Sequence, residues 1–198
     1  MLYAIHRYPT QLVDVLRLAD GRQVTIRPIL PQDAAIEQAF IAALSPAARY
    51  DRFLGPMRQL PASVLDAFTH VDYRSHLALI AEHFSGGVET IVADARYVAC
   101  PDEPRAAEMA VAVADGWRGA GLASRLLGRL ERSAAEAGFN RLTGETLATN
   151  DAMVGLARKH GYAVRRNPAA PTLLSLDKDL SPARPSKGDD PNRSRDAA

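Results

Sequence analysis

The chain has 198 residues, of which 47% are hydrophobic and 24% charged, the size and composition of one globular domain rather than two. Its 24 basic and 23 acidic residues leave a formal net charge of +1, so no overall field attracts nucleic acid or an anionic membrane. Cys100 is the only cysteine, which excludes an intrachain disulfide and a cysteine-based zinc site.

The N-terminal segment is typical of a β-hairpin followed by helices. Apolar residues alternate on both sides of Asp20-Gly21, a dipeptide that favours the two-residue turn of a hairpin. Pro28 ends the second strand, because proline has no N–H to donate to a neighbouring strand. Asp33, Ser45 and Ser63 each precede a helical pattern and are expected to cap it. These helices are expected over residues 34–44, 46–52 and 64–68.

The rest of the chain changes between strand and helix periodicity. A turn at Ser85-Gly86-Gly87 separates two apolar runs and predicts a second antiparallel hairpin. Apolar residues recur at helical spacing from Leu122 to Ala134, and Gly138 follows as a helix C-cap. The expected segments are a hairpin over residues 76–98, a strand over 106–114, a helix over 121–137, a strand over 141–147, a helix over 150–160, and strands over 162–166 and 172–176.

These segments predict a mixed α/β (α+β) fold in which antiparallel strands precede a strand-helix-strand unit. Residues 1–180 are expected to form one domain that includes the N-terminal hairpin. Residues 181–198 contain three prolines and no apolar side chain larger than alanine, so we expect a disordered tail. No stretch has the pattern of a signal peptide or a membrane span, and we expect a cytoplasmic protein with no membrane partner.

The segment from Val111 to Ser124 predicts an anion-binding loop. A buried strand leads through Asp115 into a glycine-rich loop and then a helix. The first turn of a helix has about four backbone N–H groups without an internal partner, and the helix dipole adds positive charge there. Gly119 and Gly121 would let a diphosphate approach the backbone closely. Taken alone, these glycines can equally serve only to turn the chain.

Two other phosphate-binding motifs compare poorly with this loop. A Walker A loop ends in Gly-Lys-Ser/Thr, whereas Leu122 follows Gly121. A dinucleotide fingerprint nearly matches Gly119-Ala-Gly121-Leu-Ala-Ser124, with Glu145 near the expected distance. However, little chain remains after Glu145 for a doubly wound sheet, and the preceding strands are expected to be antiparallel. The dinucleotide fold is therefore the second choice.

Two motifs in the C-terminal half carry a family resemblance. Arg118-Gly-Ala-Gly121-Leu-Ala123 resembles the (Gln/Arg)-x-x-Gly-x-(Gly/Ala) acetyl-CoA motif of the GNAT superfamily of N-acetyltransferases. The run from Asn150 to Tyr162 resembles the segment that follows it in the family, Asn-x-x-(Ala/Met)-x-x-Leu-x-x-Lys-x-Gly-(Phe/Tyr). Together they cover about residues 106–164. The resemblance implies the GNAT fold, a mostly antiparallel sheet of about six to seven strands flanked by helices, and acetyl-CoA as cosubstrate.

Upstream motifs narrow the resemblance to the acetyltransferase domain of bacterial protein lysine acetyltransferases. These motifs are Ile26-Arg-Pro-Ile29, Leu44-Ser45, Arg49-Tyr50 with Arg52-Phe53-Leu54, and Val71-Asp72-Tyr73. The implied reaction is direct attack of an amine on the thioester. A lysine amine has a pKa of about 10.4 and arrives protonated, so a base must take its proton. Ala107-Glu108 matches the position of the general base in these enzymes, and a partly buried Glu108 would have a raised pKa. Glu108 could otherwise be a solvated strand residue.

The resemblance also implies the cofactor contacts. The pantetheine chain would pair with the backbone of Val111 and Val113, and an N–H near Val111 would stabilise the negative charge on the thioester oxygen. Asn150 would contact the cofactor, or cap the helix that follows it. The tyrosine that usually reprotonates the leaving thiolate is replaced by Ala157, and water, Ser124 or Tyr73 remain as alternatives. The expected cofactor-binding residues are Val111, Val113, Arg118, Gly119, Gly121, Ala123, Ser124 and Asn150, with no metal.

Three functions are compatible with these residues. The first is acetyl transfer to a protein lysine with Glu108 as general base. The second is acetyl transfer to the amine of a small molecule. The third is a non-catalytic protein that senses acetyl-CoA. The sequence predicts no nucleic-acid partner and does not indicate an oligomeric state.

Overall fold

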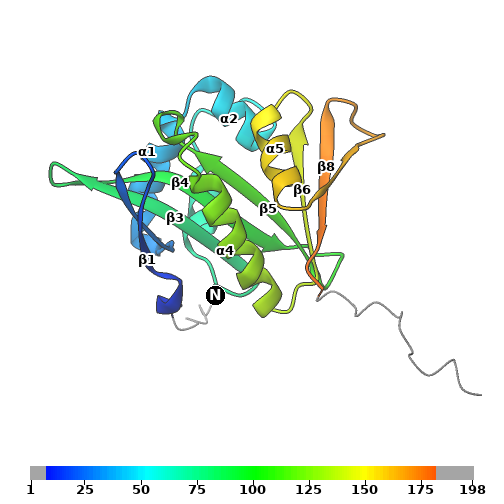
Figure 1. Ribbon diagram of the computed structural model, residues 1–198, viewed down its shortest axis with the longest axis horizontal. Coiled ribbons are helices and arrows are strands. Elements are labelled where there is room, and N and C mark those ends of the chain that lie inside the picture. The colour runs from blue at the N-terminus through cyan, green and yellow to red at the C-terminus, as the bar shows by residue number, and fades with distance from the viewer. Residues whose placement is uncertain (1–7, 182–198) are drawn as a thin grey trace, which may run out of the picture.

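The computed structural model describes residues 8–181. Within this part of the chain, the strands form one eight-stranded sheet (Figure 1). The strand order is β1-β2-β3-β4-β5-β6-β8-β7, and all neighbours are antiparallel except β5 and β6. The strands span Asp14–Arg17 (β1), Gln23–Pro28 (β2), His76–Ser85 (β3), Val88–Ala99 (β4), Ala106–Val113 (β5), Arg141–Leu147 (β6), Ala163–Arg166 (β7) and Leu173–Asp179 (β8).

The predicted order of elements is confirmed, with differences in number. The sheet has eight strands instead of six to seven, because the two short edge strands, β1 and β7, both pair along four residues with their neighbours. The antiparallel β2, β3 and β4 exclude a doubly wound parallel sheet. Residues 182–198, which hold all but the first residue of the predicted disordered tail, lie outside the described part of the chain.

The α-helices span Ala34–Ala43 (α1), Pro46–Phe53 (α2), Ala62–Thr69 (α3), Leu122–Glu136 (α4) and Asp151–Lys159 (α5).

Two of the three predicted N-terminal caps differ from the sequence-based expectation. Ser45 caps α2 as expected, because its Oγ accepts a hydrogen bond of 3.2 Å from the N–H of Ala48. The carboxylate of Asp33 accepts instead from the N–H of Leu30 and from the guanidinium of Arg27, so it ties strand β2 to the start of α1. Helix α3 begins at Ala62, two residues before the start that a Ser63 cap implies, with Pro61 at the N-cap and no side-chain capping bond.

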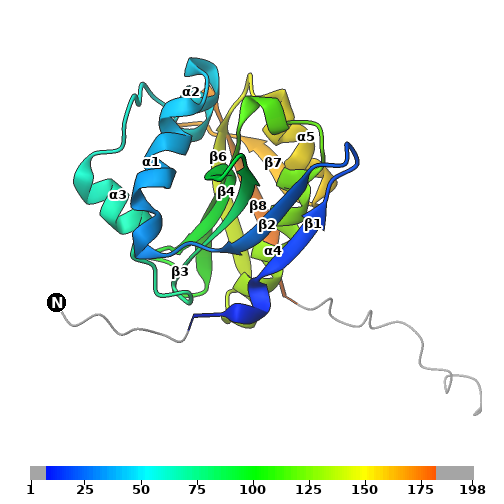
Figure 2. The same cartoon turned by 90° about the vertical axis from the view of Figure 1, so that its left-hand side faces the viewer.

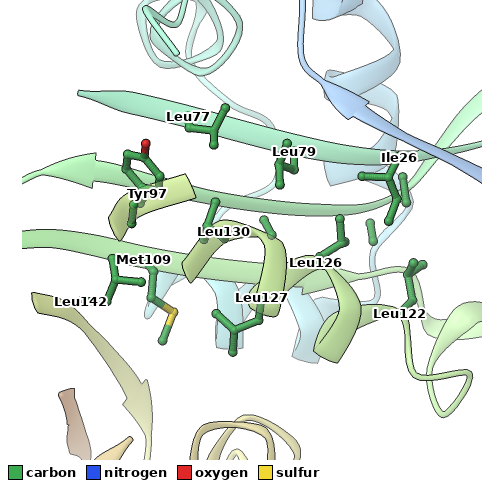
Figure 3. Close-up of a cluster of buried hydrophobic side chains, with 14 of the residues drawn as sticks. Ile26, Leu77, Leu79, Tyr97, Met109, Leu122, Leu126, Leu127, Leu130 and Leu142 are labelled. Carbon is green, nitrogen blue, oxygen red and sulfur yellow. The ribbon is translucent and has the colours of Figure 1, made fainter. Parts of the chain in front are cut away.

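Helices cover both faces of the sheet. Figure 2 shows α1, α2 and α3 on one side and α4 on the other. The apolar stripe of α4 is fully buried against β3, β4 and β5, where it meets residues such as Leu79 and Met109 (Figure 3). The stripe was predicted from helical spacing and consists of Leu122, Leu126, Leu127, Leu130 and Ala134. Because these side chains fix α4 along β5, they also fix the loop that joins the two elements.

Buried ionisable side chains lie between the sheet and α1. Arg96 on β4 pairs with Asp94 on the same strand and with Glu37 of α1 at 3.2 Å. The guanidinium of Arg96 also donates to the backbone carbonyl of Phe68 and lies 3.7 Å from the centre of the Phe68 ring. Both contacts attach α3 to the sheet.

None of the helices in the described part of the chain is long and apolar enough to cross a membrane.

Candidate active site

Strands β5 and β6 diverge halfway along their length. Their parallel pairing covers only Ala106 to Glu108 of β5, after which β5 continues beside β4 and β6 beside β8. At the point of divergence a Cβ on Gly144 would lie 3.0 Å from the carbonyl oxygen of Met109, so a larger residue would push the strands apart. The gap between the two strands opens beyond this contact, toward the C-terminal end of β5 (Figure 1).

The edge of β5 that faces this gap has backbone groups available for a ligand. The N–H of Cys100 donates to the carbonyl of Ala106, and the N–H of Ala114 donates to the carbonyl of Val92. In an antiparallel pair, backbone groups of alternate residues point to the same neighbour. The even-numbered residues of β5 therefore bond to β4, and the N–H and C=O groups of Val111 and Val113 point into the gap.

The loop after β5 and the start of α4 present a row of backbone N–H groups. The N–H groups of Trp117 and Arg118 are used, since they donate to the carbonyls of Ala114 and Asp115. Within the described residues, no protein acceptor is found for the six N–H groups from Gly119 to Ser124. No side chain caps α4, and its N-cap, Gly121, has a φ of 79° that favours glycine. The amides from Gly119 to Ser124 are therefore the free donors that the predicted anion site would use.

Long-range contacts that the sequence did not indicate hold this loop in place. The ring of Trp117 lies between His83, at 4.8 Å between ring centres, and the guanidinium of Arg22, at 3.8 Å. Arg22 also donates to the carbonyl of Gly116 at 2.9 Å. These partners come from the turn after β1 and from β3, so the N-terminal hairpin fixes a loop about a hundred residues away.

A cavity of about 400 Å³ follows the gap between β5 and β6 and the start of α4. Helices α2 and α5 close its sides. All the cofactor-binding residues expected from the sequence line it, namely Val111, Val113, Arg118, Gly119, Gly121, Ala123, Ser124 and Asn150.

Three of these lining side chains already have protein partners. Arg118 lies 3.2 Å from the carboxylate of Asp115 and is half exposed. Asn150 caps α5 through its Oδ1, which accepts a hydrogen bond of 3.0 Å from the N–H of Met153. Its amide NH₂ group remains for the cavity, so the capping and binding roles are compatible. The third, Ser124, lies 2.8 Å from the imidazole of His160.

The predicted general base, Glu108, lies beside this cavity rather than in its lining. It is exposed, which corrects the expectation of a partly buried carboxylate, because the packing that buries Ala106 and Ala112 on the same strand face does not cover this position. It occupies the last paired position before β5 and β6 diverge. Arg52 of α2 interacts electrostatically with it. Burial lowers the pKa of this arginine, while Asp94 and Glu108 act in the opposite direction.

The side chains considered as proton donors for the leaving thiolate lie elsewhere or are occupied. Ala157 is fully buried and has no proton to give. The hydroxyl of Tyr73 donates to the carbonyl of Ile29 at 2.9 Å, outside the cavity. The hydroxyl of Tyr162 is buried as well, and burial together with Glu131 raises the pKa of this phenol.

Several lining residues were not singled out by sequence reasoning. Asp51 and Arg52 reach the cavity from α2, Glu145 from β6 and Lys159 from α5. Arg52 and Lys159 belong to the motifs that carried the resemblance, which was the available signal. Asp51 carried no such signal, and Glu145 was named only as the acidic residue of the dinucleotide fingerprint. The packing of α2 and β6 beside β5 is what brings both residues to the cavity.

Comparisons with known proteins agree with this geometry. The model of the Acetyltransferase (GNAT) family matches residues 44–162. Acetyltransferase PA5475 of Pseudomonas aeruginosa is 36% identical over 151 residues, which cover 76% of this chain and 81% of that protein. Acetyltransferase Pat of Mycolicibacterium smegmatis is 27% identical over 162 residues, 82% of this chain, so the chain spans about half of that longer relative, 48%.

A solved structure has the same fold. The GNAT domain of S. lividans PAT superimposes with a TM-score of 0.78 and is 29% identical, and the match covers 87% of this chain and 99% of that domain. The diverging β5 and β6, the free amides before α4 and the matched motifs therefore lead to one conclusion. The chain belongs to the GNAT family of acetyltransferases.

Proposed function

We propose that this acetyltransferase moves the acetyl group of acetyl-CoA to the Nζ of a protein lysine, with Glu108 as general base. The observation that carries the proposal is the alignment of three features along one cavity. The six free amides from Gly119 to Ser124 suit a diphosphate, and the exposed backbone edge at Val111 and Val113 suits an extended pantetheine chain. Glu108 stands where this edge begins.

The position of Glu108 suits the deprotonation of an incoming lysine. The thioester would lie at the β5 end of the cavity, near the N–H of Val111. Glu108 takes the amine proton, the amine nitrogen bonds to the thioester carbon, and the carbonyl oxygen becomes negative. The N–H of Val111 stabilises that charge. The nitrogen, which is positively charged after the attack, releases its second proton to solvent. The C–O double bond re-forms, the C–S bond breaks, and coenzyme A leaves as a thiolate.

Solvent is the proposed proton source for this thiolate. Ala157 offers no donor, and the hydroxyl of Tyr73 is hydrogen-bonded to a backbone carbonyl.

The exposure of Glu108 supports a protein acceptor, because a lysine on the surface of another protein can reach Glu108 without entering a closed pocket.

Replacement of Glu108 by glutamine tests the role of the base. We expect Glu108→Gln to lower kcat by about 10²–10⁴-fold, the usual contribution of general-base catalysis, and to leave the affinity for acetyl-CoA unchanged. Glu103→Gln is the matched control, since Glu103 is also exposed and lies in the turn before β5. Steady-state kinetics and calorimetry measure both quantities. Equal turnover in the two variants would remove Glu108 from the mechanism.

The acceptor is identified with labelled acetyl-CoA. The protein is incubated with the coenzyme and a cell lysate, and mass spectrometry then locates the label. We expect it on lysine side chains of proteins, and only when the active chain is present. Label found only in small amines would assign a small-molecule acetyltransferase instead. Binding of acetyl-CoA without transfer to any amine would indicate a sensor.

A further inference from the structure

A buried carboxylate is connected to the cavity through a histidine. The Oγ of Ser124, in the first turn of α4, lies 2.8 Å from Nε2 of His160 at the end of α5. The other ring nitrogen, Nδ1, lies 3.2 Å from Oε1 of Glu131, two turns further along α4. The side chains of His160 and Glu131 are only 13% and 11% exposed, so water competes weakly for these contacts. Ser124 is the member that lines the cavity.

The surroundings of His160 determine where its proton resides. Oε1 of Glu131 has no hydrogen-bond partner of good geometry among the described residues, and Nδ1 of His160 lies against it at 3.2 Å. The other carboxylate oxygen, Oε2, pairs with Nζ of Lys178 on β8 at 2.7 Å. A neutral imidazole with a bare Nδ1 would place two lone pairs against each other, which is unfavourable. We therefore assign the proton to Nδ1.

Other polar and charged groups face this histidine from each neighbouring element. Arg132 approaches beside Gly128 of α4, where a Cβ on the glycine would lie 3.7 Å from the imidazole and 3.9 Å from the guanidinium. The hydroxyl of Tyr162 faces Glu131. The groups recorded around His160 and Glu131 are therefore Ser124 and Arg132 from α4, Tyr162 before β7, and Lys178 from β8, while Arg158 and Lys159 precede His160 in the last turn of α5.

The charge of His160 then decides what Ser124 presents to the cavity. While the imidazole is neutral, its bare Nε2 accepts the hydroxyl proton of Ser124, and the serine oxygen turns its lone pairs toward the ligand. When the imidazole is protonated, Nε2–H donates to Ser124 and the hydroxyl proton becomes free for a second acceptor. An anion needs a donor, so it is bound better by the protonated form.

We propose that His160, held by Glu131, is a positioning residue that turns the Ser124 hydroxyl into a donor to the coenzyme diphosphate, so that binding takes up a proton. The inference rests on the proposed placement of the diphosphate at the start of α4. By linkage, a ligand that binds the protonated form better draws a proton from solution as it binds, and its affinity falls as pH rises.

Calorimetry with 3′-dephospho-CoA measures the proton directly. This probe keeps the diphosphate and lacks the 3′-phosphate, whose own second ionisation lies near pH 6 and would confuse the result. The full chain is titrated at pH 7 in two buffers with different ionisation enthalpies, and the difference in heat gives the protons taken up. We also expect affinity to fall about fivefold from pH 6 to pH 8, since one hydrogen bond contributes a factor of that order.

Two substitutions separate positioning from packing. In His160→Gln an amide NH₂ group can donate to Ser124 at every pH, so affinity should remain near the low-pH value with proton uptake reduced. In Ser124→Ala the imidazole remains, but uptake should fall because the hydroxyl is absent. His70→Gln, at the C-cap of α3 and outside the cavity, is the control and should retain the wild-type uptake. Thermal melting confirms that each variant is folded.

The possible failures are distinguishable. If 3′-dephospho-CoA binds and the uptake is equal in wild type and His160→Gln, the role of His160 is refuted and the proposed function stands. If Ser124→Ala keeps the full uptake, the proton belongs to another group and the proposal is equally wrong. If the wild-type protein does not bind 3′-dephospho-CoA at millimolar concentration, the placement of the diphosphate fails, and with it this inference.

Discussion

Glu37 is the buried carboxyl with the clearest effect on stability. It is fully buried, and burial together with the nearby Asp94 raises its pKa to about 8. Between its ordinary value of 4.5 and pH 8, the folded state holds a proton that the unfolded state has lost. The free energy of unfolding therefore decreases as pH rises through this window, by up to about 1.4 kcal/mol per pH unit.

His76 opposes this trend at lower pH. Burial lowers its pKa from 6.5 to about 4, so the unfolded state binds a proton there that the folded state does not, and stability falls as pH falls below 6.5. From about pH 6.5 to 8 the Glu37 effect should be seen alone. We expect Glu37→Gln to flatten the decrease over this range, measured by urea denaturation at several pH values. Glu136→Gln, an exposed residue of α4, should retain it, and an unchanged slope in Glu37→Gln would contradict the prediction.

Gly121 is the glycine whose backbone conformation matters most for the cavity. Its φ is 79°, and a Cβ there would meet no atom within 4 Å, so an alanine would be strained without a clash. We expect Gly121→Ala to lower the free energy of unfolding by about 1–2 kcal/mol and to weaken acetyl-CoA binding, because the strain is relieved by moving the free amides. Chemical denaturation and calorimetry measure the two effects.

Two glycines serve as controls for this substitution. Gly138 has a φ of 99° and lies outside the cavity, so Gly138→Ala should lose stability and keep its affinity. Gly116 precedes the free amides and has no such φ, so Gly116→Ala should change neither quantity appreciably. Equal cofactor affinity in Gly121→Ala and wild type would show that the conformation of this glycine does not position the amides.

At the scale of elements, Asp115 joins the cofactor loop to helix α2. Its carboxylate accepts hydrogen bonds from the N–H of Ser45 at 2.9 Å and from its hydroxyl at 3.1 Å, and it also pairs with Arg118. The bond from the Ser45 N–H is the main reason that the pKa of Asp115 lies below its usual range. The start of α2 and the start of α4 are therefore linked through one side chain.

Replacement of the Asp115 carboxylate should weaken the link between the cofactor loop and helix α2. We expect Asp115→Ala to cost about 1 kcal/mol in the free energy of unfolding, typical of a lost hydrogen bond, and to raise KM for both acetyl-CoA and the acceptor. Asp115→Asn keeps one acceptor oxygen and should have a smaller effect. Asp102→Ala, in the exposed turn before β5, is the control. A rise in only one KM would show that α2 and the loop are independent.

The whole molecule should be stabilised by its coenzyme, because the cavity is built from parts far apart in the chain. A ligand present at 100 times its Kd stabilises the folded state by about 2.7 kcal/mol. For a chain of this length, we expect acetyl-CoA to raise Tm by about 5–10 °C. Thermal melting with and without the coenzyme measures the shift. No shift at millimolar acetyl-CoA would contradict the assignment of the cavity.

The sequence by itself determined the order of elements, the α4 stripe and the cofactor motif. These depend on local properties: the Asp20-Gly21 turn, the spacing from Leu122 to Ala134, and glycines at the start of α4. Each can be recognised within a short segment, because turn geometry and helical period repeat over a few residues. The resemblance then supplied the family, which the comparisons confirmed.

Only the tertiary structure decided which side chains meet. The contact of Ser124 with His160 joins residues 36 apart, and the contact between Arg22 and Gly116 joins residues 94 apart. It also decided that Glu108 is exposed, since burial depends on whether a helix covers that end of β5. Such contacts arise from the packing of whole elements against the sheet, and no local pattern of residues encodes them.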